Sequence, residues 1–167
     1  MITIEELTPD YFALCAEWLS RPEINRWLTA EWRGRTVEST TLAMLLRNKK
    51  NRVWLSMCDG QPCGIVAIAD LDAGDHTGMV WYILGESGQS GKGITSQALR
   101  QMCASAMQEM GLNSLYAWAM EDNAPSRRVL EKAGFQPSGR IRQAAVSAGR
   151  QVDRLYYDLT AQDLSPG

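Results

Sequence analysis

The sequence lacks any apolar run of about 18 residues, the length that a membrane-spanning helix needs. Its N-terminal segment contains Glu5 and Glu6 and has neither the basic start nor the apolar centre of a signal peptide. The 17 Lys and Arg residues are outnumbered by 19 Asp and Glu residues, so no positive excess is available for holding nucleic-acid phosphates. We therefore expect no membrane span, no signal peptide and no general nucleic-acid binding.

Residues that commonly bind metals are scarce as well. The chain has one histidine, His76, and four cysteines, none of them in a Cys-x-x-Cys pair: Cys15, Cys58, Cys63 and Cys103. A structural zinc site needs four such ligands at short spacings, so we expect no metal. Cys15 and Cys103 lie in apolar helical patterns, which favours buried, reduced thiols in a cytoplasmic protein. No local motif supports a catalytic Cys–His pair.

What the sequence does contain is typical of one globular domain. Its 167 residues are 45% hydrophobic and 22% charged, which suits a single core that needs no cross-links. No repeat or linker interrupts residues 1–163, and residues 164–167 are predicted to be a frayed tail.

Hydrophobic periodicity and turn residues divide the chain into strands and helices. The predicted strands are 2–7, 53–59, 63–69, 79–84, 115–120, 141–146 and 152–159, and the predicted helices are 9–19, a short one after residue 24, 36–49, 94–110 and 123–133. With the short helix after residue 24 left out, the order β-α-α-β-β-β-α-β-α-β-β predicts an α/β (α+β) fold. Its mixed, mostly antiparallel sheet would carry helices on both faces and contain one β-α-β crossover.

The segment Gln89-Ser90-Gly91-Lys92-Gly93-Ile94 lies between a predicted strand and the long predicted helix. Glycines allow a tight backbone turn, and the free N–H groups at a helix start attract an anion such as a phosphate or pyrophosphate. The segment is neither a Walker A loop nor a dinucleotide fingerprint, because Gly93 follows Lys92 and Ser96 replaces the third glycine. Taken alone, the pattern also fits an ordinary strand–helix turn.

A second pattern runs from Asn123 to Phe135, as Asn-x-x-Ser followed by a helix and a Gly-Phe stop. Both Asn123 and Ser126 can accept hydrogen bonds from free helix N–H groups, so they could be simple capping residues.

Together, the two patterns resemble the GCN5-related N-acetyltransferases (GNAT), and most of all their RimJ/RimL-like branch. The resemblance covers the whole chain. It implies an acetyl-CoA-dependent acyltransferase that moves an acetyl group to a primary amine, with acetyl-CoA as the acyl donor. The strand 79–84 would then splay from 115–120, and the pantetheine arm would lie in the gap like an added strand.

The resemblance also assigns roles to individual residues. A backbone N–H of Ile83 or Leu84 would polarise the thioester carbonyl. Asn123 would contact the pantetheine, and Ser126 would lie near the sulfur. The pyrophosphate would sit on the turn that leads into the long helix, on Gln89, Ser90, Gly91, Lys92, Gly93, Ile94 and Thr95.

Two positions depart from the family pattern. Gly88 stands where the family has Gln or Arg, so Lys92 or Gln89 would have to supply a side-chain phosphate contact. Leu130 stands seven residues after Asn123, where many members carry a tyrosine that serves as general acid. A non-catalytic acyl-CoA-binding or regulatory module of the same fold is therefore the alternative.

An attacking amine has a pKa near 10 and must lose a proton first, so a base is needed. Glu121, Glu86 and His76 are near-equal candidates, because they lie in loops beside the predicted central strands.

We expect the acceptor to contact Trp27, Trp32, Arg33 and Tyr82. It would be a small amine, an amino sugar that is free or nucleotide-linked, or a protein N-terminus. A homodimer through the last strands is a further expectation.

Overall fold

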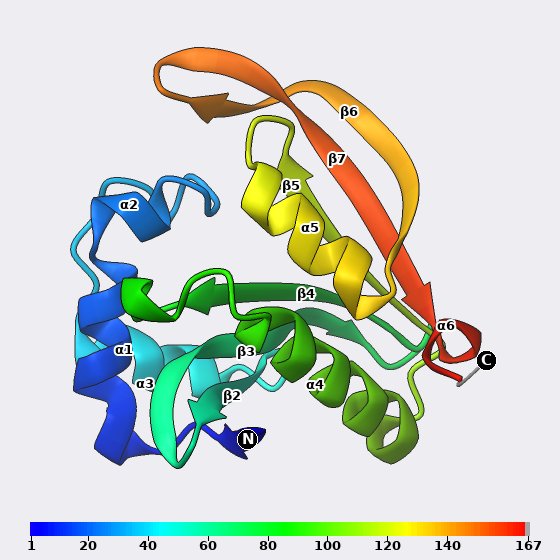
Figure 1. Ribbon diagram of the computed structural model, residues 1–167, viewed down its shortest axis with the longest axis horizontal. Helices are drawn as coiled ribbons and strands as arrows, with labels where there is room; N and C mark the ends of the chain where they lie inside the picture. Colours follow the sequence, from blue (N-terminus) through cyan, green and yellow to red (C-terminus); the bar gives the residue numbers. More distant parts are fainter. Residues whose placement is uncertain (166–167) are drawn as a thin grey trace.

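The computed structural model describes residues 1–165, apart from the side chain of Ser87, and is built around one seven-stranded sheet (Figure 1). The strand order is β1-β2-β3-β4-β5-β7-β6, and only β4 and β5 are parallel. The strands are β1 (Ile2–Glu6), β2 (Arg52–Cys58), β3 (Gln61–Asp72), β4 (Thr77–Leu84), β5 (Ser114–Met120), β6 (Gln136–Ser147) and β7 (Arg150–Thr160). The predicted mixed, mostly antiparallel sheet is confirmed.

Helices cover both faces of the sheet, as predicted. They are α1 (Phe12–Leu19), α2 (Pro22–Asn25), α3 (Ser39–Arg47), α4 (Ile94–Met110), α5 (Ala124–Ala133) and α6 (Ala161–Leu164), with single 3-10 turns at Pro9–Tyr11 and Ser87–Gln89. None of the helices in residues 1–165 is both long and apolar enough to cross a membrane.

The longest helix, α4, has the bounds that the sequence pattern predicted. Its apolar residues recur every four positions, so Ala98, Met102 and Ala106 share the face that packs on the sheet. Gly111 ends the helix with a φ of 64°, a left-handed conformation that glycine adopts without a steric penalty. Helix α5 packs on the same face, and its Leu130 belongs to the same core.

The opposite face of the sheet is covered by α1 and α3. Their Leu19 and Leu42 are fully buried against β2 and β3. Strand β4 divides its side chains between the two cores: Val80 and Tyr82 pack with the α4 cluster, while Trp81 and Ile83 pack with the α1–α3 cluster.

The central strands β4 and β5 pair only at their start. Thr77 pairs with Ser114, Gly78 with Leu115 and Met79 with Tyr116. Within residues 1–165 the two strands form no further pair. In Figure 1, β4 crosses the molecule while β5 and the β6–β7 hairpin rise away from it. The predicted splay is therefore present, and it leaves the edges of both strands open along the rest of their length.

Several predicted segment ends need correction, most clearly those of α2 and β6. The short helix α2 begins at Pro22, earlier than expected, because proline suits a first helical turn. Strand β6 begins at Gln136 instead of 141, because it pairs with β7 on both sides of an irregular stretch that contains Gln143 at a φ of 53°. Such pairing depends on the partner strand, so it has no local signal.

The expected frayed tail of residues 164–167 is also partly wrong. Leu164 ends helix α6, and its carbonyl accepts a 3.2 Å hydrogen bond from Arg100. A capping box between Thr160 and Asp163 begins this helix, and its sequence signature was overlooked. Residues 166 and 167 lie outside the described residues.

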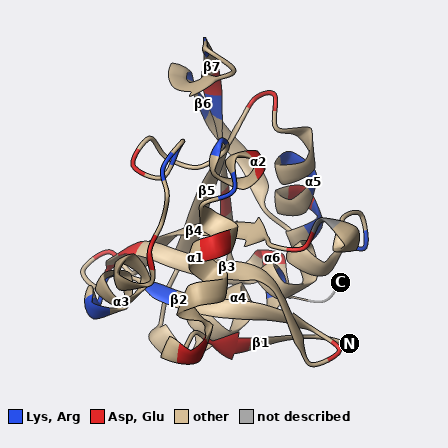
Figure 2. Cartoon of the chain, turned by 90° about the vertical axis from the view of Figure 1, so that its left-hand side faces the viewer, with Lys and Arg blue, Asp and Glu red and all other residues tan. Residues whose placement is uncertain are grey.

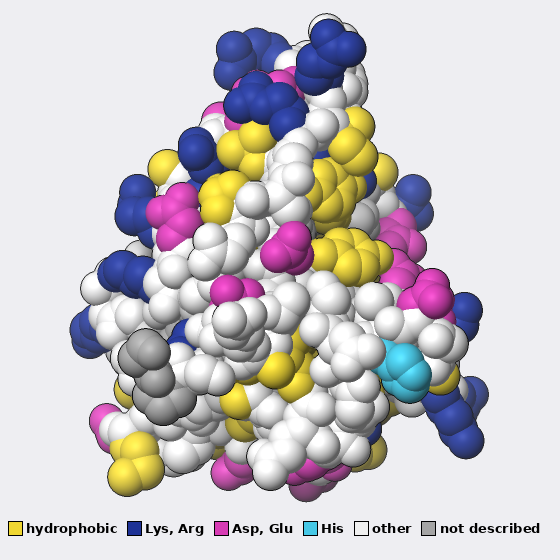
Figure 3. All heavy atoms as spheres, turned by 90° about the vertical axis from the view of Figure 1, so that its right-hand side faces the viewer, with side chains coloured by type: hydrophobic (Ala, Val, Ile, Leu, Met, Phe, Trp, Pro, Cys, Tyr) yellow, Lys and Arg dark blue, Asp and Glu magenta, His cyan; other side chains and the backbone are white. Residues whose placement is uncertain are grey.

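Charged side chains are distributed over the whole surface (Figure 2), with acidic residues near β1 and α1. Lys and Arg side chains gather at one end of the molecule (Figure 3), where the β6–β7 hairpin carries Arg140, Arg142 and Arg150. Arg140 pairs with Asp153 across the hairpin at 2.6 Å. The backbone N–H of Gln143 and the Arg140 guanidinium both hold the pKa of Asp153 below its usual value.

Candidate active site

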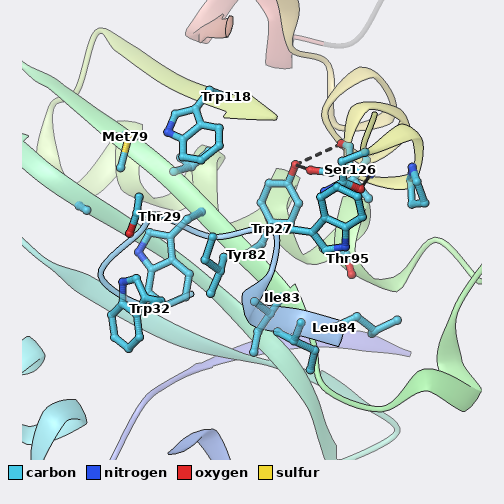
Figure 4. A pocket seen from close by; sticks show the side chains of 18 of the residues that line it. Trp27, Thr29, Trp32, Met79, Tyr82, Ile83, Leu84, Thr95, Trp118 and Ser126 are labelled. Atoms are coloured by element: carbon cyan, nitrogen blue, oxygen red, sulfur yellow. Dashed lines mark hydrogen bonds between the residues drawn. The ribbon is translucent and has the colours of Figure 1, made fainter. Parts of the chain in front are cut away.

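A cavity of about 850 Å³ opens where β4 and β5 separate (Figure 4). Its walls come from α2 and the loop after it (residues 22–33, called the α2 segment here), from α3, β4 and β5, from the glycine turn before α4 and from the start of α5. The cavity therefore lies in the gap that the resemblance assigned to the pantetheine arm.

One end of the cavity is formed by the glycine turn. Gly91 and Gly93 have φ values of 80° and 73°, so both need the left-handed conformation that disfavours side chains. The first helical hydrogen bond of α4 runs from Gln97 N–H to Gly93 carbonyl, which leaves the preceding N–H groups without helical acceptors. Nothing lies within 4 Å of a β-carbon built on Gly91. Free donors beside open space suit a phosphate group.

Most of the predicted phosphate-binding residues line the cavity: Gln89, Ser90, Gly91, Gly93, Ile94 and Thr95. Lys92 does not. It is exposed, and its ammonium lies 3.3 Å from the side-chain oxygen of Gln89.

The start of α5 forms the neighbouring wall. Asn123 caps the helix, since its side-chain oxygen accepts a 3.3 Å bond from the Ser126 N–H. Ser126 then faces Tyr82 of β4, with 2.6 Å between the two hydroxyl oxygens. Asn123, Ser126 and Tyr82 all line the cavity, as does Pro125 in the first turn.

The backbone of β4 presents alternate residues to the gap. The Gly85 N–H donates to the Cys63 carbonyl, so the odd-numbered residues of β4 exchange their hydrogen bonds with β3. On the other edge, the His76 carbonyl accepts from β5, which places the even-numbered residues toward the gap. Of the two predicted donors, this register favours Leu84 over Ile83, although both residues line the cavity.

Four tryptophan rings form much of the remaining wall. Trp27, Trp32, Trp81 and Trp118 come from the α2 segment, β4 and β5. Trp32 and Trp81 pair with their ring centroids 6.2 Å apart, and Trp27 and Trp118 pack beside Met120. Figure 4 draws Trp27 on the side of Ser126 and Thr95, and Trp32 and Trp118 on the opposite side of Tyr82. The sequence analysis predicted Trp27 and Trp32 but missed Trp118, whose alternation with Leu115 and Ala117 along β5 was a usable signal.

Acidic and basic residues of the cavity wall come from different elements of the fold. Glu23, Glu31 and Asp70 contribute carboxylates from the α2 segment and the end of β3. The cationic wall residues are Arg128 and Lys132, both on α5. The sequence analysis missed all five, because only the folded chain brings these separate segments to one cavity.

The three predicted bases do not line the cavity. Glu86 accepts a 2.9 Å bond from the indole of buried Trp18. Glu121 accepts from the Asp153 backbone N–H on β7 and lies 3.8 Å from Arg140. His76 is exposed in the turn before β4, at the end where β4 and β5 are still paired.

Arg33, predicted to contact the acceptor, does not line the cavity either. Its guanidinium donates to the Leu28 carbonyl at 3.0 Å, so it stabilises the loop that carries the tryptophans. Leu130, at the position of the family tyrosine, is fully buried in the α4 core and has no contact with the cavity. Among residues 1–165, no group of three or more His, Cys, Asp or Glu side chains is placed to hold a metal ion.

Fold and site together define a split sheet whose gap, with free helix N–H groups beside it, suits an extended, phosphate-bearing ligand. A family model described as "Acetyltransferase (GNAT) domain" matches residues 2–136, and the chain belongs to this family. The resemblance noted in the sequence is thereby confirmed.

One relative is a Bacillus subtilis (strain 168) protein named "Putative ribosomal N-acetyltransferase YdaF". It is 30% identical over 105 residues, which are 63% of this chain and 57% of the relative. The chain thus spans little more than half of that relative's length.

Solved structures share the fold. A spermidine N-acetyltransferase from Vibrio cholerae, in complex with CoA and spermine, superposes with a TM-score of 0.86 at 14% identity and covers 98% of this chain and 97% of its own. Mycobacterium smegmatis RimJ, in complex with a CoA disulfide, superposes with a TM-score of 0.83 at 20% identity, over 99% of this chain and 85% of RimJ. At these identities, both likenesses show the shared fold.

Proposed function

We propose that this chain transfers an acetyl group from acetyl-CoA to the primary amine of a small acceptor that carries positive charge. The observation that carries the proposal is a single cavity whose wall combines two kinds of surface. The glycine turn and α5 offer backbone donors and cations, while the α2 segment, β3, β4 and β5 offer tryptophan rings and carboxylates.

The glycine turn and α5 fit a CoA thioester. The free N–H groups at the start of α4 suit the pyrophosphate, and Arg128 and Lys132 add positive charge on the facing helix. The even-numbered residues of β4 leave backbone groups for the pantetheine amides, and the Leu84 N–H can polarise the thioester carbonyl. Relatives solved with CoA support this assignment.

The tryptophan rings and carboxylates favour a cation as the acceptor. Tryptophan faces attract ammonium groups, and Glu23, Glu31 and Asp70 add negative charge. Arg26 and Arg154 already stack on one face each of Trp27 and Trp118, with 4.1 and 4.0 Å from guanidinium carbon to ring centroid. A ligand cation would therefore use the other faces or the paired rings of Trp32 and Trp81. A nucleotide-linked amino sugar is disfavoured, because Arg33 does not reach the cavity and no other Arg or Lys of the α2 segment does. The spermine in the Vibrio cholerae structure is a ligand of the favoured kind.

The proposed chemistry is direct attack of the amine on the thioester. Because an alkyl amine has a pKa near 10, one of the cavity carboxylates would accept its proton, directly or through water. Holding the amine and the carbonyl in one cavity supplies most of the rate by positioning. Ser126, at the start of α5, would donate a hydrogen bond to the leaving sulfur.

An acceptor panel tests the proposal. It would contain a polyamine, an aminoglycoside, an N-terminal peptide and a nucleotide-linked amino sugar, with CoA thiol release and product mass as readouts. We expect the polyamine or the aminoglycoside to give the highest kcat/KM. Preference for the nucleotide-linked sugar or the peptide would contradict the cationic acceptor. CoA binding without turnover of any amine would favour the non-catalytic module.

Charge-neutralising variants test the wall itself. Glu31→Gln and Asp70→Asn should each raise KM for the cationic acceptor by about 1.5- to fivefold, because each removes one attraction while CoA affinity stays unchanged. Asparagine tolerates the φ of 52° at position 70. Glu5→Gln is the matched control, since Glu5 is exposed on the edge strand β1 and is not a wall residue. Equal KM values in all three variants would contradict the assignment.

A further inference from the structure

The hydroxyl groups of Tyr82 and Ser126 form a close pair between β4 and α5. Their oxygens are 2.6 Å apart, and the Tyr82 hydroxyl also lies 3.1 Å from the Ser126 carbonyl oxygen (Figure 4). The two residues are 44 positions apart in the chain, and both line the cavity. The sequence analysis placed Tyr82 with the acceptor, whereas the structure pairs its hydroxyl with Ser126 of α5.

Tyr82 is held as a neutral phenol. Its ring packs with the α4 core, and this burial raises the pKa of its hydroxyl well above the usual value of a tyrosine. The phenol therefore keeps its proton at neutral pH and acts as a hydrogen-bond donor. The hydroxyl can donate this single proton to the Ser126 carbonyl oxygen at 3.1 Å. Across the 2.6 Å contact either hydroxyl can donate, so Tyr82 can instead direct its proton to the Ser126 hydroxyl oxygen.

Ser126 is oriented from its other side by the helix cap. Its N–H donates to the Asn123 side chain, so the residue is fixed at the first turn of α5. A serine hydroxyl can accept one hydrogen bond while donating its own proton to another group. With Tyr82 donating to it, the Ser126 proton is free to point into the cavity.

We propose that Tyr82 is a positioning residue that polarises the Ser126 hydroxyl toward the leaving sulfur. This inference rests on the proposed acetyl transfer. It supplies the donor that Leu130 cannot supply, because Leu130 is apolar and buried away from the cavity. Two hydroxyls joined in series place a polarised O–H where one serine alone would be a weak donor.

The reaction balances without ionising Tyr82. The C–N bond forms, the C–S bond breaks, and sulfur leaves with the electron pair. The sulfur accepts the Ser126 hydrogen bond as a thiolate, whose ordinary pKa near 8.5 lies below that of the phenol, so proton transfer from Tyr82 would be unfavourable. The proton that the amine loses finally balances the thiolate through solvent.

Tyr82→Phe tests the inference, because it keeps the ring in the core and removes only the hydroxyl. We expect kcat to fall about 10- to 100-fold, the usual loss for a hydrogen bond that serves a charged group, with KM for acetyl-CoA and CoA affinity unchanged. Tyr156→Phe is the matched control: Tyr156 is a half-buried tyrosine of β7, and no side-chain hydrogen bond is recorded for it.

Ser126→Ala and the double variant complete a double-mutant cycle. The result for Ser126→Ala holds even if Tyr82→Phe folds poorly. Ser126→Ala should lower kcat at least as much as Tyr82→Phe, and the double variant should be no slower than Ser126→Ala alone, because Tyr82 acts through Ser126. Full activity of Ser126→Ala, multiplying effects in the double variant, or lost CoA affinity with unchanged kcat in Tyr82→Phe would each overturn the proposal. Unchanged kcat in Tyr82→Phe would mean that Ser126 donates to Tyr82 instead.

Failure of the proposed acetyl transfer and failure of the proposed Tyr82 role give different results. If the wild-type chain acetylates an amine but these variants do not change kcat, only the role of Tyr82 is overturned. If the wild-type chain acetylates none of the panel amines, both the acetyl transfer and the role of Tyr82 are overturned.

Discussion

At position 130, a leucine occupies the place where many relatives carry a tyrosine, and its surroundings explain why it is apolar. Leu130 is fully buried with Leu99, Leu115 and Leu159 in the core between α4 and the sheet. It reaches no part of the cavity wall. At this site the side chain contributes to stability through packing, and the hydroxyl chemistry lies at Ser126 and Tyr82.

Leu130→Tyr should therefore destabilise the protein without restoring an acid. The larger ring overpacks a full core, which typically costs about 1–3 kcal/mol of unfolding free energy. Urea unfolding measures this loss, with Leu130→Met as the control that preserves volume and should cost under about 1.5 kcal/mol. A stable and faster Leu130→Tyr enzyme would show that position 130 can reach the reacting atoms after all.

At the scale of an element, the glycine turn and α4 work as one anion-binding unit. The helix supplies free N–H groups and the positive end of its dipole, and the two glycines bring the backbone close to the ligand. Gly91 and Gly111, near opposite ends of the helix, share the left-handed conformation and have open space around them. Comparing the same substitution at these two glycines therefore separates the effect of backbone strain from the effect of ligand contact.

Gly91→Val and Gly111→Val should lose similar amounts of stability, because a β-branched residue is strained at positive φ in both places. Only Gly91→Val should weaken CoA binding, by at least about tenfold, because it alters the turn that approaches the pyrophosphate. Isothermal titration with CoA and a thermal melt measure the two effects separately. Equal CoA affinity in the two folded variants would place the pyrophosphate elsewhere.

At the scale of the whole molecule, the cavity lies between two cores on opposite faces of the central sheet. One core contains α4 and α5, and the other contains α1 and α3. A ligand in the gap between β4 and β5 would contact both, as well as the strand edges that pair with no other strand. Binding to the folded state alone must raise stability, since the unfolded chain has no such gap.

CoA at 100 times its Kd should stabilise the chain by about 2.7 kcal/mol. For a domain of this length, that corresponds to a rise in Tm of roughly 5–11 °C. Differential scanning fluorimetry with CoA measures the shift, and adenosine is the control because it lacks the phosphates and the pantetheine arm. A shift with adenosine as large as the shift with CoA would argue against recognition through the glycine turn.

The sequence by itself determined those parts of the protein whose causes are local. Helix α4 follows from an apolar repeat of four residues and a glycine stop, and the cap of α5 follows from Asn123, three positions before Ser126. The anion-binding turn follows in the same way, because glycines and free helix N–H groups are neighbours in the chain. The succession of strands and helices along the chain followed from hydrophobic periodicity and agrees with the family resemblance.

Only the tertiary structure decided how distant segments meet. The backbone N–H of Leu84, rather than that of Ile83, points toward the gap. This follows from the register of β4 with its neighbours, and register depends on partner strands. Folding joins Glu31, Asp70 and Trp118 in one cavity while it commits Glu86 and Glu121 to contacts elsewhere. The pairing of Tyr82 with Ser126 has the same origin, because chain positions far apart become neighbours only when the sheet and α5 pack together.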